Sequence, residues 1–170
     1  ESIIRLFDMG MDPFNFADAL LGVLAQRLAK RLCKCKAAYQ PDDQEVEQLL
    51  NEYAEELKNT HDWQADPAVA RQALRSEWQQ RFTDSDGRFA LYRPTGCDQC
   101  ANTGYKGRVG LHELLVGTDE IKKRIQEHAL VAELFAVALQ EGMRTLKQDG
   151  IEKVLQGITD FAQVRAVCIK

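Results

Sequence analysis

The sequence predicts an α+β fold that is mostly helical, and three features of the chain support this prediction. Apolar residues recur at helical spacing through residues 42–82 and again from residue 118 onward. Residues 88–93 and 109–114 show the shorter patterns that fit strands. Two close pairs of cysteines, separated by the first helical stretch, suggest four thiolates on one metal ion.

Composition and charge exclude several classes of protein. The chain has 170 residues, 45% hydrophobic and 28% charged, which fits one medium or two small folded domains. Its formal net charge of -4 has the opposite sign from that of a sequence-independent nucleic-acid binder. No apolar run approaches the ~20 residues that cross a bilayer, and no initiator Met or secretory signal opens the chain. We therefore expect a piece of a longer soluble protein from the reducing cytosol.

The first elements are two short helices and a segment of ambiguous pattern. An amphipathic helix is predicted over residues 2–9 and is ended by Gly10. Pro13 begins a second helix, which is expected to reach about Leu21. The leucines at 24, 28 and 32 fit a helix by their spacing, but they also fit the inward face of a strand, and the strand is favoured.

A helical hairpin is predicted over residues 42–82. Asp42 or Asp43 can cap its first helix and Asp66 its second, and residues 59–65 between them are predicted to be a polar loop. The segment 41–88 carries 12 acidic and 5 basic residues, an excess that indicates a solvated outer face. The two helices are expected to pack through one apolar stripe each, made of Val46, Leu49, Leu50, Tyr53 and Leu57 in the first and Val69, Ala73, Leu74, Trp78 and Phe82 in the second.

The C-terminal third is predicted to be helical. After the strands at 88–93 and 109–114, the second of which ends near Gly117, four helices follow. Gly142 and Gly157 end the second and third of them. The four apolar stripes are Ile121 and Ile125; Leu130, Leu134, Ala138 and Leu139; Ile151, Val154 and Leu155; and Phe161, Val164 and Val167.

Cys97 and Cys100 are the strongest candidate ligands for a metal. A C-x-x-C turn places two sulfurs a little under ~4 Å apart, as tetrahedral zinc requires, and the nearby glycines let the backbone wrap closely. A redox motif or two inert buried thiols are the alternatives, although the βαβ pattern of a redox protein is missing. The other pair, Cys33 and Cys35, is a C-x-C, whose Cβ atoms lie about 6.6 Å apart in an extended strand. Both can ligate only if the chain turns sharply there.

Alternative ligand sets stay open for this site. One cysteine of the first pair together with His61, His112 or water could complete the shell, or the site could hold no metal. Four thiolates on Zn²⁺ carry a net charge of -2, which nearby cations would offset, namely Lys34, Lys36, Lys106 and Arg108. A shell of four protein sulfurs leaves no open position for water, so its role would be structural.

Common catalytic motifs are missing from the sequence. It contains no G-x-x-x-x-G-K-[ST], no H-E-x-x-H and no G-x-S-x-G. His112 and Glu113 are adjacent, so in a strand they point to opposite faces and do not form an acid–base couple. We therefore expect no catalytic residue in this chain.

Several sequence blocks follow one another in a distinctive order, at residues 5–10, 13–14, 24–28, 31–33, 96–115, 142–146, 149–150 and 153–159. The most specific reads Gly96-Cys97-x-x-Cys100-x-x-Thr103-Gly104-Tyr105-x-Gly107-Arg108-x-Gly110-x-x-Glu113-Leu114-Leu115. Together they resemble the C-terminal part of the hexameric ATPases that drive type II secretion and type IV pilus assembly. The chain has C-x-C where that family usually has C-x-x-C, and 61 residues lie between the two cysteine pairs.

The resemblance implies a division of the chain and a set of cofactors. Residues 1–32 would be the end of a RecA-like ATPase core, 33–117 the tetracysteine zinc lobe with its helical insert at about 42–82, and 118–170 a C-terminal helical subdomain. In the family, the phosphate loop, the magnesium-binding acidic motif and the catalytic Glu precede this segment. Structural zinc on Cys33, Cys35, Cys97 and Cys100 is thus the cofactor expected here, while ATP and magnesium belong to the full-length protein. Arg27 is expected at the nucleotide-side surface.

The resemblance also implies partners and a location. The partners would be the other subunits of a hexameric ring and the inner-membrane platform proteins, and the protein would be cytoplasmic, at the inner face of the membrane. The piece itself would brace the ATPase core and hydrolyse no ATP alone. The alternatives are a free-standing zinc-ribbon adaptor or nucleic-acid-binding module, favoured by five basic residues in 27–36, and an interaction scaffold without metal.

Overall fold

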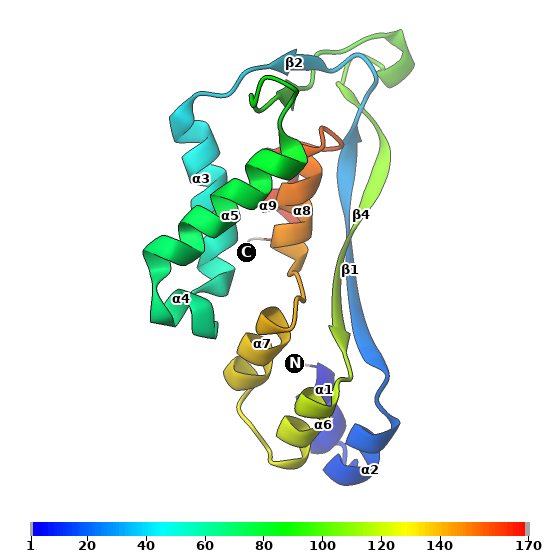
Figure 1. The fold of residues 1–170 in the computed structure, drawn as a ribbon. Helices are drawn as coiled ribbons and strands as arrows, with labels where there is room; N and C mark the ends of the chain where they lie inside the picture. The colour runs from blue at the N-terminus through cyan, green and yellow to red at the C-terminus, as the bar shows by residue number, and fades with distance from the viewer. Residues whose placement is uncertain (1, 169–170) are drawn as a thin grey trace.

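The computed structural model describes residues 2–168, without the side chains of Ser2, Ile4 and Phe7, and the fold is α+β and mostly helical, as predicted (Figure 1). Within residues 2–168, every helix is too short or too polar to span a bilayer. The elements are α1 (Ser2–Asp8), α2 (Pro13–Ala19), β1 (Gly22–Leu32), β2 (Ala37–Tyr39), α3 (Asp43–Ala54), η1 (Glu55–Leu57), α4 (His61–Ala65), α5 (Pro67–Phe82), β3 (Leu91–Arg93), η2 (Asp98–Cys100), β4 (Tyr105–Val116), α6 (Asp119–Gln126), α7 (Val131–Gln140), α8 (Leu146–Leu155) and α9 (Phe161–Cys168).

A long antiparallel ribbon of β1 and β4 runs along one side of the molecule (Figure 1). The two strands pair from Gly22 with Val116 to Lys30 with Arg108, so the strand favoured for this segment is confirmed. The expectation that all three leucines face inward is wrong, because Leu24 and Leu28 are 61% and 49% exposed. The residues that alternate with them, such as Ala29 (1% exposed), turn towards the helices instead.

Most of the predicted boundaries lie within a few residues of the observed ones. The exceptions are 59–65, where η1 is followed by α4 instead of a polar loop, and 88–93, where only β3 is a strand. Thr60 is buried and its hydroxyl donates to the Leu57 carbonyl, which stabilises the helical turns. The shorter strand follows from a turn in which the Asp84 carboxylate accepts hydrogen bonds from the amides of Asp86 and Arg88.

Only some of the residues in the apolar stripe predicted for α5 are buried. Leu74 and Trp78 are buried, and Trp78 packs edge-to-face against Tyr53 of α3 with ring centroids 5.3 Å apart. Val69, however, is 64% exposed. It lies five positions before Leu74, about 140° around the helix, whereas Trp78 follows at the four-residue spacing that keeps one face.

The helical insert shares one hydrophobic core with the last two helices. This shared core joins buried side chains that are about 100 positions apart along the chain, and it crosses the domain boundary expected at residue 118. Its buried members are Leu49, Leu50, Tyr53, Ala54, Leu74, Trp78, Leu91, Ile151, Val154, Leu155 and Val164. The insert is therefore solvated on its outer side only.

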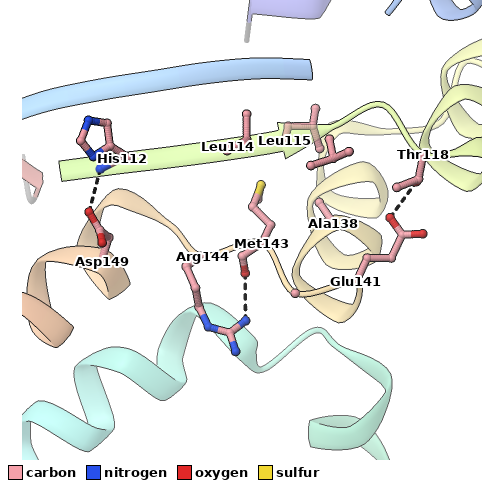
Figure 2. Close-up of a pocket in the computed structure, with 11 residues that line it drawn as sticks. His112, Leu114, Leu115, Thr118, Ala138, Glu141, Met143, Arg144 and Asp149 are labelled. Carbon is pink, nitrogen blue, oxygen red and sulfur yellow. Dashed lines mark hydrogen bonds between the residues drawn. The ribbon is translucent and has the colours of Figure 1, made fainter. Parts of the chain in front are cut away.

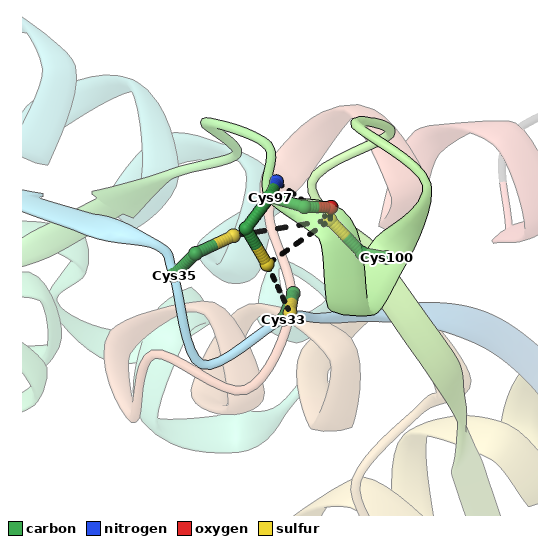
Figure 3. Close-up of side chains that lie close together, drawn as sticks. All are labelled: Cys33, Cys35, Cys97 and Cys100. Carbon is green, nitrogen blue, oxygen red and sulfur yellow. Dashed lines mark hydrogen bonds between the residues drawn. The ribbon is translucent and has the colours of Figure 1, made fainter.

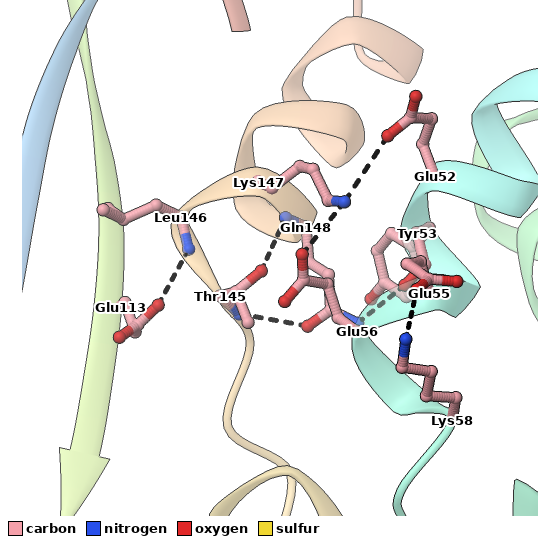
Figure 4. A network of polar contacts seen from close by, with 10 residues as sticks. All are labelled: Glu52, Tyr53, Glu55, Glu56, Lys58, Glu113, Thr145, Leu146, Lys147 and Gln148. Atoms are coloured by element: carbon pink, nitrogen blue, oxygen red, sulfur yellow. Dashed lines mark hydrogen bonds and ion pairs between the residues drawn. The ribbon is translucent and has the colours of Figure 1, made fainter. Parts of the chain in front are cut away.

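Polar contacts reinforce this contact between α3, η1 and α8 (Figure 4). The Lys147 ammonium lies 2.9 Å from Glu56 Oε1 and 3.4 Å from Glu52 Oε2. Gln148, which is fully buried, donates from Nε2 to the Tyr53 carbonyl at 3.2 Å. Because buried polar groups of this kind are costly to leave unpaired, the insert and α8 are expected to unfold together.

The ionisation of the Tyr53 phenol is expected to lower the free energy of unfolding at alkaline pH. Burial, and then the negative charge of Glu152, raise the pKa of Tyr53 above its ordinary value of 10.0. The folded state therefore holds the phenol proton more tightly than the unfolded chain, so this contribution is complete below pH ~10 and is lost as the pH rises above it. Between pH 10 and 11, we expect urea unfolding to show a loss of up to about 1 kcal/mol that Tyr53→Phe does not share. Parallel losses in the two proteins would contradict this.

A second core lies at the other end of the ribbon, where α1 and α2 pack against α6 and α7. Its buried members are Ala17, Leu20, Ile121, Ile125 and Ala138. Beside it, a cavity of about 480 Å³ separates β4 from the α7–α8 connection (Figure 2). Around this cavity, the His112 amide donates to Asp149 Oδ2 at 2.8 Å and the Thr118 hydroxyl donates to Glu141 Oε2 at 2.8 Å. These hydrogen bonds tie α8 to β4 and the end of α7 to the start of α6.

Candidate metal centre

Four cysteine side chains meet at one end of the ribbon, where β1 ends and the turn before β4 begins (Figure 3). All four Sγ atoms lie within 4.8 Å of one another. The Sγ–Sγ distances are 3.9 Å for Cys33–Cys97, 3.9 Å for Cys35–Cys100 and 3.8 Å for Cys97–Cys100. Sulfurs on a tetrahedral zinc ion are about 3.8 Å apart, so the cluster has the size that zinc requires.

The C-x-C half reaches the cluster because the chain turns sharply at its two cysteines. The Lys36 amide donates to the Cys33 carbonyl at 3.0 Å, which closes a turn directly after β1. This turn replaces the extended geometry that would hold the two side chains about 6.6 Å apart. The Cys33 amide donates to the Gly104 carbonyl at 2.9 Å and ties this half to the other one.

The C-x-x-C half is a compact knuckle around η2. The amides of Cys97 and Gly104 donate to Cys100 Sγ at 3.2 and 3.3 Å. Gly104 has φ +78°, and a Cβ atom there would lie 2.4 Å from Cβ of Pro94, so a glycine is required at this position. The knuckle thus brings two backbone donors to one sulfur.

The electrostatics of the knuckle favour a thiolate at Cys100. Burial alone would raise the pKa of its thiol, but the amides of Cys97 and Gly104 lower that pKa to about 6. Burial and hydrogen bonds with neighbouring thiols raise the pKa of Cys97 to about 11. A hydrogen bond with Thr95 lowers the pKa of Cys35. A soft cation would remove the remaining thiol protons, because metals bind the thiolate form.

The other candidate residues lie apart from the cysteine cluster. Among the described residues, the cluster of possible ligands contains the four cysteines and neither histidine. His61 begins α4 beside Asp62, and His112 lies on β4 opposite Gln26. Arg27 is exposed in the middle of β1, about 20 Å along the strand from Cys33.

Two threonines support the cluster and were not identified from the sequence. The Thr95 hydroxyl donates to the Cys35 carbonyl at 2.5 Å, and the Thr103 hydroxyl donates to the Cys100 carbonyl at 2.6 Å. Each precedes a glycine, Gly96 or Gly104, on either side of the C-x-x-C motif. This repeated Thr-Gly pair is the signal that could have indicated their role.

The ribbon, the cysteine cluster at its end and the helices along it define a helical module built around a tetracysteine lobe. The family described as "Type II/IV secretion system protein" matches residues 1–166. The chain belongs to this family, which confirms the resemblance seen in the sequence.

Three relatives show the extent of the similarity. The chain is 38% identical over 172 residues to "Type IV pilus assembly ATPase PilB" of Thermus thermophilus, covering 100% of the chain and 16% of that protein. It is 34% identical over 165 residues to "Type II secretion system protein E" of Pectobacterium carotovorum, covering 96% of the chain and 26% of that protein. It is 32% identical over 171 residues to "Type II secretion system ATPase E" of Vibrio cholerae, covering 98% of the chain and 27% of that protein. The chain thus spans 16% to 27% of the length of these relatives.

Proposed function

We propose that the chain is the C-terminal part of a hexameric ATPase that powers type II secretion or type IV pilus assembly. The match over residues 1–166 and the names of the relatives support this proposal. In this proposal, residues 1–32 complete a RecA-like core, 33–117 form the metal lobe and 118–170 form a helical subdomain that stays packed on the helical insert. ATP and magnesium bind elsewhere in the full-length protein, and Arg27 belongs to its nucleotide-side surface.

The proposed role of this part is mechanical support. It braces the ATPase core in a ring of subunits and offers the lobe and the acidic insert to inner-membrane platform proteins, at the cytoplasmic face of the membrane. The continuous packing from the ribbon to α8 and α9, and from these helices to the insert, supports this role, because a brace must resist deformation.

A structural zinc ion is the second part of the proposal. Its ligands would be Cys33, Cys35, Cys97 and Cys100, and the observation that carries it is the convergence of four Sγ atoms within 4.8 Å. Zinc would join the end of β1 to the turn before β4, in addition to the hydrogen bond from the Cys33 amide to the Gly104 carbonyl. The amides that donate to Cys100 would orient its sulfur and offset its negative charge.

Elemental analysis of the purified chain tests the zinc proposal. We expect about one zinc ion per chain, because one four-sulfur shell saturates one ion. A strong chelator should lower the melting temperature, since the free energy of metal binding is also folding free energy. Substoichiometric zinc after refolding with the metal, or a melting curve unaffected by the chelator, would contradict the proposal.

The same preparation tests the wider function. The chain alone should show no ATP turnover, because the sequence contains no phosphate-binding loop. It should also show no salt-dependent binding to DNA or RNA, since its net charge is -4. ATP turnover would contradict a supporting role, and nucleic-acid binding would favour the zinc-ribbon alternative.

A further inference from the structure

The turn between α8 and α9, residues 157–160, makes hydrogen bonds to the chain on both sides of the C-x-C half of the metal centre. The Leu32 amide, directly before Cys33, donates to the Ile158 carbonyl at 2.9 Å. The Lys36 ammonium, directly after Cys35, donates to the Gly157 carbonyl. Two successive carbonyls of the 157–160 turn therefore hold the two ends of the cysteine turn.

The fit between the two turns depends on a glycine. Gly157 has φ +71°, and a Cβ atom there would lie 2.4 Å from the Tyr92 ring and 3.0 Å from the Lys36 Nζ atom. The Lys36 ammonium lies 4.1 Å from the centroid of the same ring. Without a side chain at position 157, the lysine can lie between the aromatic ring and the turn.

Two further hydrogen bonds connect the 157–160 turn with the ribbon. Thr159 is 1% exposed, and its hydroxyl donates to the Lys30 carbonyl at 2.7 Å. The Tyr105 hydroxyl, at the start of β4, donates to Asp160 Oδ2 at 2.5 Å. The turn thus contacts the ribbon at Lys30, three positions before Cys33, and at Tyr105, five positions after Cys100.

We propose that the 157–160 turn positions the C-x-C half of the metal centre, so that zinc affinity and the order of α9 are linked. The inference rests on the zinc site of the proposed function. A C-x-C pair can bring both sulfurs to one ion only if the chain bends out of the extended strand. The 157–160 turn holds Leu32 and Lys36, the residues directly before and after the two cysteines. By thermodynamic linkage, zinc must then stabilise the turn as much as the turn favours zinc. Lys36, Gly157 and Thr159 are positioning residues and not ligands.

Chelator competition on the full chain measures the effect on zinc. We expect Lys36→Met and Thr159→Val each to weaken zinc binding at least ~10-fold, as is typical when support of a metal ligand is lost. Lys36→Arg keeps a cation and a donor and should retain most of the affinity. Lys34→Met is the matched control, because it removes the same charge from an exposed residue between the two cysteines and should change affinity by less than about threefold.

Hydrogen exchange measures the reverse effect. Removal of zinc from the wild-type chain should speed exchange of the amides of α9 and leave those of α6, at the far end of the ribbon, unchanged. In urea unfolding, Thr159→Val should destabilise the zinc-bound chain more than the zinc-free chain, whereas a purely structural role would destabilise both equally.

The outcomes separate the two proposals. A wild-type chain that binds no zinc would overturn the proposed zinc site together with this inference. A wild-type chain that binds zinc tightly, with equal affinity in Lys36→Met and Thr159→Val, would overturn the inference and leave the zinc site intact. Equal losses in Lys36→Met and Lys34→Met would also overturn it, because charge would then explain the effect.

Discussion

Replacing Cys100 with serine is expected to abolish zinc binding and to unfold the lobe. Cys100 carries the thiolate that the backbone stabilises most, with its pKa lowered to about 6, so its loss removes both a ligand and the partner of two amides. At free zinc about 1,000 times the dissociation constant, bound zinc contributes about 4 kcal/mol of stability, and Cys100→Ser should lose a comparable amount. Urea unfolding with and without zinc measures this difference.

The control for this prediction is Cys168→Ser. Cys168 ends α9 and lies outside the cluster of four sulfurs, so the variant should keep one zinc ion per chain and the zinc-dependent part of its stability. If Cys100→Ser bound zinc as well as Cys168→Ser, the four-sulfur site would be refuted.

Truncation of Trp78 to alanine is expected to destabilise the C-terminal helices as well as the insert. Trp78 is 1% exposed in the shared core, and removing a buried tryptophan side chain costs about 3–5 kcal/mol. Because Ile151, Val154 and Val164 belong to the same core, amides of α8 and α9 should lose protection together with those of α3 and α5. Urea unfolding gives the magnitude, and hydrogen exchange shows which helices are affected.

Val69→Ala provides a matched change on the same helix. Val69 is 64% exposed, so this truncation should change the free energy of unfolding by less than about 0.5 kcal/mol. Loss of protection in α5 alone after Trp78→Ala would show that the insert folds independently of α8 and α9.

The elements that could be predicted from the sequence are those specified by neighbouring residues. Helix α5 begins where Asp66 accepts hydrogen bonds from the amides of Ala68 and Val69, and α8 begins with a capping box between Thr145 and Gln148. Both signals lie within a few residues of the helix that they start. The orientation of β1 was not predictable in this way, because only its pairing with β4 decides which side chains face the helices.

That the four cysteines cluster was predictable from the sequence, but the contacts that support the cluster were not. The C-x-x-C knuckle follows from local spacing and from Gly104. The turn at Cys33 and Cys35 depends on contacts with Ile158 and Gly157, more than 120 positions later in the chain, and local spacing does not contain this information. The same reason explains why the shared core between the insert and α8 was not foreseen.

The pairing of β1 with β4 has a consequence for how the chain folds. Gly22 pairs with Val116, 94 positions further along (22 to 116), and the intervening residues include the whole insert. Closing so long a loop carries a large entropic penalty, which a preformed hairpin of α3 and α5 would reduce by shortening the effective distance. Local helical contacts should therefore nucleate folding. The pairing of β1 with β4 should form late, starting at the cysteine end and proceeding towards Gly22.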